Sequence, residues 1–529
     1  MLRSTFLGYK TATSALKVHQ NYMDITGQNM ANVNTKGYTR QRLDTASFGF
    51  TARNLKFSLG GVVIGQGVNS LGVSQYRDPF LDLRYRTAAA KTGDQEVQLE
   101  ALSDLELFFD EIAKDGLDSQ FSDLWNQLQN LANNGSTDPV YQSVVRTSAQ
   151  VLTQMLNDYA GQMETVRDQQ YEYMKNGATV EVNQLLKNIS ILNQQIKEAN
   201  IGGNPALELN DERNLLIDKL SSYLDIEVKV EKINIGGDNY VDELSINLKL
   251  ENGTKVKIVD NKEFAEFKTS ENGRDVLFEV TDLNGNNSDL TNEITKGKIG
   301  GYIKFLNGKG EYDTTAGVTN SDARGVQYYQ NLLDTLANKF ATTMNELNRE
   351  PTHYDSEGVG DVFGADKPLF GSRDGVGTDI TAKSIKIHDD WAESKDAYIT
   401  HTILEPKGNN DDKAAADNIL RMIDAFKTDN DFTTEYDGTG SGLFKGTFQE
   451  FVSFSVTKLN LQVSETEKTH ESYLISEYQI DFERSSLSSV DFNEEGVNLL
   501  QYSKSYNAAA RLMTTLDEML DTLINRMGV

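Results

Sequence analysis

The chain has 529 residues, a length that predicts roughly two to four domains with cores of their own. It has no cysteine, which excludes disulfides, thiolate catalysis and cysteine-bound zinc, and its net charge of -28 argues against nucleic-acid binding. No apolar run is long enough to span a membrane, and the first twenty residues lack the continuous apolar segment of a cleavable secretory signal.

The N-terminal segment predicts an amphipathic helix that ends near Met30. Its apolar residues recur at steps of three and four, which places them on one helix face. The Asn, Thr and Gly residues of 31–37 favour a turn and should end the helix. The basic, glycine-containing stretch that follows, up to Gly67, predicts a loop with short strands.

Helical periodicity returns from about Asp78 to Ile112 and again over residues 121–131. Asp138 followed by Pro139 is the pattern of a helix N-cap and its first helical residue. The apolar register that follows changes phase near Gly177, which predicts a stutter or kink in one very long helix.

From Tyr223 the apolar period falls to two, which indicates strands. The candidate strands lie at 226–230, 244–250, 256–258 and 276–280, with Gly, Asn and Asp between them. The sequence therefore predicts an antiparallel β domain that ends near Leu306.

Helix is expected again from about Arg324 to Arg349. A second, shorter insertion should follow, with strand candidates at Ser384 to His388 and Tyr398 to Leu404. The pattern is helical once more from Asp411 to Phe426 and from Gly446 to about Ser485.

The C-terminal segment from Leu499 carries the clearest heptad seam of the chain. One apolar stripe releases less free energy on burial than ordering its backbone costs, so the segment needs a partner. The N-terminal seam is the expected partner, and a neighbouring copy is the alternative. Charge agrees, because residues 1–60 carry a net +6 and residues 491–529 a net -3.

The predicted fold class is α+β and multidomain: a long α-helical coiled-coil or bundle core built from both ends of the chain, with inserted antiparallel β domains. The expected domains are a terminal helical core, a long-helix bundle, a β insert and a small second insert. Their limits are 1–75 with 486–529, 76–222 with 318–350 and 407–485, 223–317, and 351–406, respectively.

Two motifs near the chain ends resemble those of a known superfamily. The N-terminal one is ANVNTKGYTRQ, residues 31–41, and the C-terminal one is EEGVNLLQYSKSYNAAARLMTTLDEMLDTLINRM, residues 494–527. Both resemble the signatures of the axial proteins of the bacterial flagellum, which include rod, hook and first hook-associated proteins. Long helices that enclose β domains resemble the flagellar hook-associated protein 1 family more than the hook protein.

This resemblance implies a non-enzymatic structural protein of the hook-filament junction, exported by the flagellar type III route and needing no cofactor. It would be cytoplasmic before export and extracellular afterwards. The implied partners are other copies in a helical ring, the hook protein, hook-associated protein 3, and an export chaperone at the C-terminal helix. The terminal segments would stay disordered until they assemble. A hook or distal rod protein, a secreted coiled-coil adhesin and, more remotely, a hydrolase remain as alternatives.

The expected assembly interface lies in the two seams and the N-terminal motif. A heptad seam is also common in ordinary cores, and Tyr38 and Arg40, which the resemblance places between subunits, could instead belong to a solvated basic loop. The interface residues are Phe6, Tyr9, Leu16, Met23, Met30, Asn32, Asn34, Gly37, Tyr38, Arg40, Leu499, Tyr502, Tyr506, Met513, Leu516, Leu520, Leu523 and Met527.

Catalytic patterns are missing from the sequence. No two of the five histidines lie three or four residues apart, there is no H-E-x-x-H or G-x-S-x-G, and the glycines at 438–442 indicate a flexible loop. One spacing is similar to a calcium loop, but Asn287 stands where the loop needs glycine, so a polar hairpin is the favoured interpretation. The residues of that spacing are Asp282, Asn284, Asn286, Ser288 and Glu293.

Overall fold

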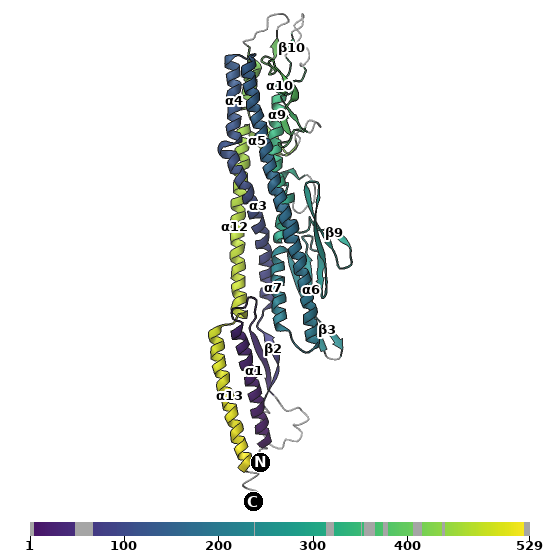
Figure 1. Ribbon diagram of the computed structural model, residues 1–529, viewed down its shortest axis with the longest axis vertical. Helices are drawn as coiled ribbons and strands as arrows, with labels where there is room; N and C mark the ends of the chain where they lie inside the picture. The colour runs from purple at the N-terminus through teal and green to yellow at the C-terminus, as the bar shows by residue number, and fades with distance from the viewer. Residues whose placement is uncertain are drawn as a thin grey trace.

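A computed structural model describes residues 5–47, 67–236, 239–313, 322–350, 352–353, 365–373, 379–405, 415–435 and 440–522. The molecule is elongated (Figure 1). Long helices run along it, small sheets lie along one side, and the first and last helices lie together at one end, below the rest of the chain. The predicted α+β class is confirmed.

One end of the elongated molecule is built from the N-terminal and the C-terminal segments of the chain. Helix α1 (Thr5–Ala31) ends where the sequence predicted, and it lies beside the C-terminal helix α13 (Phe492–Asp521). Strands β1 (Gln41–Ser47) and β2 (Val68–Gln75) pair antiparallel and contact α1. The predicted pairing of the terminal segments is therefore confirmed within one chain.

The body is a bundle of long helices. Asp78 and Asp138 cap α3 and α5 by accepting the N–H groups of Phe80 and Val140, as the sequence predicted for Asp138. Thr447 and Glu450 form a capping box that begins the last helix of the body. The long helices are α3 (Pro79–Asp115), α4 (Leu117–Asn134), α5 (Pro139–Glu172), α6 (Thr179–Ile201), α7 (Leu207–Tyr223), α9 (Val326–Leu347) and α12 (Phe448–Ser488).

The predicted phase change in the long helix is a π-helical segment, η1 (Tyr173–Ala178), between α5 and α6. The π-helical turn holds one extra residue, so the buried position shifts by one along the sequence. Tyr173 is 46% exposed, whereas Met174 is fully buried. The Met174 carbonyl accepts the backbone N–H of Thr179, as a π-helical turn requires, and also the Thr179 hydroxyl at 2.8 Å.

Two antiparallel sheets follow α7, as the alternation predicted. In the first, the strand order is β3 (Ile226–Gly236), β4 (Asn239–Lys249), β5 (Lys255–Asp260) and β6 (Glu263–Phe264). In the second it is β7 (Glu266–Asn272), β8 (Asp275–Thr281) and β9 (Asn287–Asp289). Val276, Phe278 and Val280 of β8 are buried on one face.

The last part of the segment predicted as a β domain, residues Gly297–Asn307, forms helix α8, which was not predicted from the sequence. Glycine has a low helix propensity, so the glycines of this segment concealed the helix. They serve its packing: a Cβ on Gly301 would stand 2.6 Å from the Asp94 carbonyl oxygen of α3. A short 3-10 turn, η2 (Gly310–Tyr312), follows.

The second insertion is only partly as predicted. Strand β12 (Ile385–Ile387) pairs with β11 (Phe370–Ser372), but of Tyr398 to Leu404 only Leu404 is in a strand. The N–H groups of Tyr398 and Ile399 donate instead to the side chain of Gln142 on α5. The remaining elements are β10 (Thr352–His353) with β13 (Leu404–Glu405), and α10 (Asp389–Glu393).

Two further corrections concern the stretch before α12. Helix α11 (Asp417–Ala425) begins later than the predicted Asp411, and residues 406–414 lie outside the described ranges. An unpredicted hairpin of β14 (Asn430–Thr433) and β15 (Gly442–Gly446) separates α11 from α12.

The hydrophobic core runs through the body and is densest where α4, α9 and α12 meet. Phe121, Phe340 and Phe448 are fully buried there, with ring centroids 5.4 to 5.9 Å apart. Among the described residues, this connected core includes none from α1 or α13. The terminal pair is therefore attached to the body by other means.

Candidate functional site

Helices α1 and α13 pack antiparallel in a heptad register. Leu516 lies against Gly8, where an added Cβ would stand 3.4 Å from the leucine methyls. The rings of Tyr22 and Tyr502 stack with centroids 4.6 Å apart, fourteen residues further along α1 and fourteen earlier along α13. Another heptad brings the Asn29 amide within 3.3 Å of the Glu495 carboxylate.

The predicted seam residues lie mostly at this contact but are not fully covered. Tyr9 is 43% exposed. Phe6 is in α1, its side chain lies outside the described part of the chain, and Leu523 and Met527 lie outside the described residues altogether. The half-buried seam residues are Leu16, Met23, Met30, Leu499, Tyr502, Tyr506, Met513, Leu516 and Leu520.

A second apolar stripe on α13 was not predicted, and we call it the outer α13 stripe. Its members are 49% to 64% exposed although they are large and apolar. The heptad interpretation ignored them because they fall between the seam positions. They are Val497, Leu500, Leu512 and Met519.

The N-terminal motif forms the turn that leads out of α1. The Asn32 amide donates to the Gln28 carbonyl, and the Thr35 N–H donates to the Asn32 carbonyl at 2.9 Å. Gly37 adopts φ +82°, a left-handed conformation that favours glycine, beside Leu215 of α7. Asn34 is exposed.

Asn29 and Tyr38 fix the next strand to this turn. The Asn29 side chain, 1% exposed, accepts the Gln41 N–H and donates to the Gln41 carbonyl, each at 3.0 Å. The Tyr38 hydroxyl donates to Asn29 at 2.9 Å. Burial, with the charges of Glu208 and Asp211, raises the pKa of Tyr38, so this phenol stays a neutral donor.

Arg40 ties α13 to the motif. Its Nε donates to Glu495 at 2.8 Å, its Nη2 donates to Glu494 at 2.8 Å, and its backbone N–H donates to the Ser488 carbonyl. Burial opposes its charge, but bonds to these two carboxylates outweigh burial and raise the pKa of Arg40. Tyr38 and Arg40 thus bond within the chain, and a contact with a neighbouring copy stays a prediction for them.

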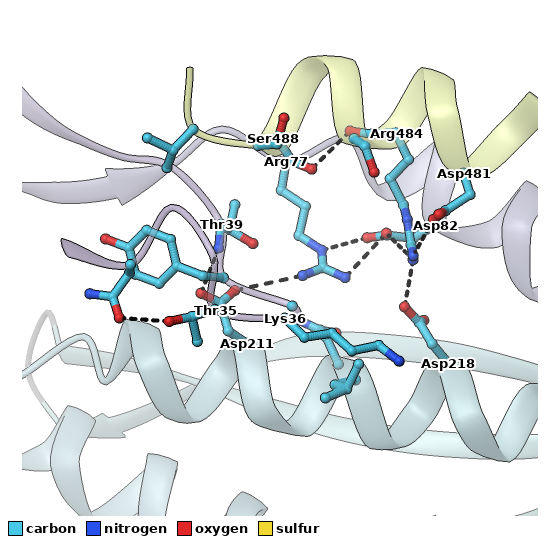
Figure 2. A pocket seen from close by; sticks show the side chains of 18 of the residues that line it. Thr35, Lys36, Thr39, Arg77, Asp82, Asp211, Asp218, Asp481, Arg484 and Ser488 are labelled. Atoms are coloured by element: carbon cyan, nitrogen blue, oxygen red, sulfur yellow. Dashed lines mark hydrogen bonds and ion pairs between the residues drawn. The ribbon is translucent and has the colours of Figure 1, made fainter. Parts of the chain in front are cut away.

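A polar cavity of about 260 Å³ lies where the terminal pair meets the body (Figure 2). Asp211 of α7, 6% exposed, accepts the Thr39 N–H and the Gln75 side chain at 2.9 Å each. Burial raises the pKa of Asp211, against the hydrogen bonds from Thr39. Arg77 bonds Asp82 at 2.6 Å on the same cavity wall.

Arg484 of α12 completes this joint. Its guanidinium pairs with Asp218 of α7 and Asp481 of its own helix (Figure 2). It also lies 4.0 Å from the ring centroid of Tyr85. Arg77 and Arg484 are thus paired with carboxylates around the cavity. The joint between the terminal pair and the body is therefore held by hydrogen bonds and ion pairs.

The calcium-like spacing forms the turn between β8 and β9. The Asp282 carboxylate accepts the N–H groups of Asn284 and Asn286 at 2.9 and 2.8 Å, and these bonds lower its pKa. Ser288 lies in β9, and the Glu293 N–H donates to the Leu290 carbonyl. Within the described ranges, no three His, Asp or Glu residues gather in a way that could hold a metal ion.

None of the helices that the structure describes combines the length and the apolar character needed to cross a membrane.

Three family models match this chain. The model of the flagellar hook-associated protein FlgK helical domain matches residues 102–363. The flagella basal body rod protein model matches residues 10–39, and the flagellar basal body rod FlgEFG protein C-terminal model matches residues 484–527. The two terminal matches coincide with the α1 and α13 regions of the joint.

Individual relatives agree with these models. Flagellar hook-associated protein 1 of Escherichia coli K12 is 23% identical over 364 residues, covering 68% of this chain and 60% of that protein. The solved structure of the flagellar hook junction protein FlgK from Burkholderia pseudomallei has 19% identity and a TM-score of 0.41, and covers 55% of this chain and 46% of that one. Flagellar hook-associated protein 1 of Bacillus subtilis strain 168 is 30% identical over 544 residues, covering 100% of this chain and 99% of that protein. The chain therefore belongs to the flagellar hook-associated protein 1 family.

Proposed function

We propose that this chain is a non-enzymatic structural component of the bacterial flagellum that joins the hook to the filament. The observation that carries the proposal is the terminal helix pair. Each helix covers one face of the other, while Val497, Leu500 and Leu512 face solvent. Apolar residues that a monomer leaves exposed mark a surface that another protein covers.

In this proposal, copies stand side by side in a helical ring one layer deep. Their terminal pairs line an inner tube, and the outer α13 stripe of one copy contacts the terminal pair of the next. The body and the inserts at 223–317 and 351–406 point outward. Because one face of the ring meets the hook protein and the other meets hook-associated protein 3, the contacts are heterologous.

The same exposed surface explains how assembly could wait for export. The terminal pair contributes nothing to the connected core of the body, so it can open and pass through the type III channel without cost to that core. In the cytoplasm, a chaperone would cover the C-terminal helix. Outside the cell, the pair would fold fully among its neighbours at the growing tip.

Complementation of cells that lack the gene tests the proposal. A chain without residues 491–529 should give hooks without filaments, with flagellin shed into the medium. Full-length Leu500→Asp/Leu512→Asp should be exported and recovered from the medium but should not assemble. The matched control is Gln501→Asp, because Gln501 is an exposed polar residue of the same helix. A truncated chain that still completes filaments would refute the proposal.

A further inference from the structure

The lower half of α12, which borders the joint, has two apolar faces. Its inner face packs on α3, where Ile480 is 8% exposed and Arg484 covers the ring of Tyr85. Its other face carries four large apolar side chains that are 49% to 74% exposed. We call these four the outer α12 patch: Leu474, Ile475, Tyr478 and Phe482.

Helix geometry places the outer α12 patch opposite the inner face. At 100° per residue, Tyr478 and Phe482 each stand about 200° around the helix from Ile480. Tyr478 follows Leu474 by four residues and Ile475 by three, so the four side chains share one surface.

A cluster of such side chains is found only in the lower half of α12; above it, Leu461 is exposed singly, at 58%. In the upper half, Phe448, Phe451 and Leu459 are at most 1% exposed because α4 and α9 pack on that part. Below them α12 lies along α3. A surface helix ordinarily carries polar residues on its free face. Four large apolar side chains there indicate a second packing partner.

The opposite flank of the body offers a matching face. The helices of the lower body contact one another in the order α12, α3, α7, α6, so α12 and α6 are the outer helices of this layer, and the sheets pack beside α6 (Figure 1). On α6, Val180 is 57% exposed and Ile191 is 45% exposed, with the exposed Lys187 between them.

Helix α7 shows that the two faces stand at the same height. Its Asp218 bonds Arg484 of α12, and its Tyr223 hydroxyl donates to Glu181 of α6 at 2.8 Å. Asp218 and Tyr223 are five residues apart, which is only about 8 Å along a helix axis. Two copies side by side would therefore bring the α12 flank of one level with the α6 flank of the other.

We propose that the outer α12 patch packs against the exposed face of α6 in a second copy of this chain. This contact rests on the proposed function, since it joins neighbours in the ring and continues the outer α13 stripe onto the body. Charge favours α6 as the occupant. Glu471, seven residues before Tyr478, extends the same surface and carries a charge opposite to that of Lys187.

The contact is too small to act alone. The patch exposes only a few hundred Å² of apolar surface, whereas stable pairs bury about 800 Å² on each partner. It therefore forms only where the terminal pairs already hold copies together. Because the two surfaces differ, the contact repeats around the ring and does not close into a dimer.

The cysteine-free chain allows a clean crosslinking test. Full-length Tyr478→Cys and Ile191→Cys chains are co-expressed in cells that lack the gene, and isolated hook-filament complexes are treated with a short bis-maleimide. A crosslinked dimer should form only when both variants are present. The matched control is Ser476→Cys with Ile191→Cys, because Ser476 is exposed on another face of α12.

Crosslinked dimers from the Tyr478→Cys chain alone would overturn the proposed contact, because they would mean that the outer α12 patches of two copies contact each other. Failure of the mixture to crosslink would also overturn it, provided that a maleimide dye on Ser476→Cys locates the protein at the junction. A dye signal absent from the junction would overturn the proposed function and the contact together.

A charge exchange gives a second readout. Lys187→Glu should lose the crosslink, and Glu471→Lys in the same chain should restore it in the ring. Both residues are exposed, so the thermal unfolding midpoint should not change. A crosslink unaffected by Lys187→Glu would place another face of the neighbour on the patch.

Discussion

The upper body and the terminal pair differ in how completely their apolar side chains are buried. In the body, Phe340 is fully buried and touches the rings of Phe121, Phe426 and Phe448. In the described part of α13, only Glu495 and Ala509 are buried. The core of the upper body is therefore complete within a single chain, whereas the terminal pair is covered on one side only.

Phe340→Ala should give the largest effect, because it removes a ring that four elements surround. We expect a loss of about 3–5 kcal/mol in the free energy of unfolding of the body, measured by urea denaturation. Tyr502→Ala in the terminal pair should leave this main transition unchanged. Equal losses from both variants would mean that the two regions unfold as one unit.

Arg40→Met should have the next largest effect, confined to the terminal pair. It leaves the Glu495 carboxylate, 2% exposed, without its charged partner, which costs about 3 kcal/mol. Amide exchange along α13 should speed up while exchange in α9 stays slow. Arg42→Met is the control, because the Arg42 side chain is 50% exposed. Unchanged exchange in α13 would show that Arg40 does not hold it.

Glu311→Gln should give the smallest effect, at the surface of the body. Burial opposes the Glu311 charge, but bonds from Arg324 and Lys458 lower its pKa from 4.5 to about 2. A lowered pKa stabilises the fold above pH 4.5 and loses that contribution as the pH falls towards 2. Because the side chain is 35% exposed, we expect only about 1 kcal/mol at pH 7.

Urea denaturation of Glu311→Gln and the parent chain at pH 7 and pH 3 measures this contribution. The difference between the two chains should shrink at the lower pH. A difference that stays constant would mean that the ion pairs of Glu311 do not stabilise the body.

Elements with a long, regular apolar period could be predicted from the sequence. The ends of α1, the Asp138 cap and the phase change before α6 all follow from local spacing. Helix α8 could not be predicted, because its glycines are explained by close backbone contacts, such as those of Gly297 with Tyr223 and Gly301 with Asp94. Likewise, the main chain of Tyr398 is bound by Gln142, 256 residues away.

The sequence predicted which segments form the site, but not which residues bond to one another there. The motif at 31–41 and the C-terminal seam marked the right segments, and the opposite charges of the two ends agree with the pairing of Arg40 and Glu495. No local spacing links these two residues, which are 455 positions apart. Asp211 carries no sequence signal either, because its partners, the Thr39 N–H and the Gln75 side chain, are 172 and 136 positions away.

The π-helical segment gives the rod a way to change its outer shape during evolution. Helix α5 faces the upper core and α6 faces the sheets, and one extra residue in the turn between them sets the angle between those two directions. Deleting one residue there would rotate the faces of α6 relative to those of α5 by about 100°. Loss or gain of a single codon could therefore change the direction in which the sheets project from a flagellar joint, while the terminal pairs that line its tube stay the same.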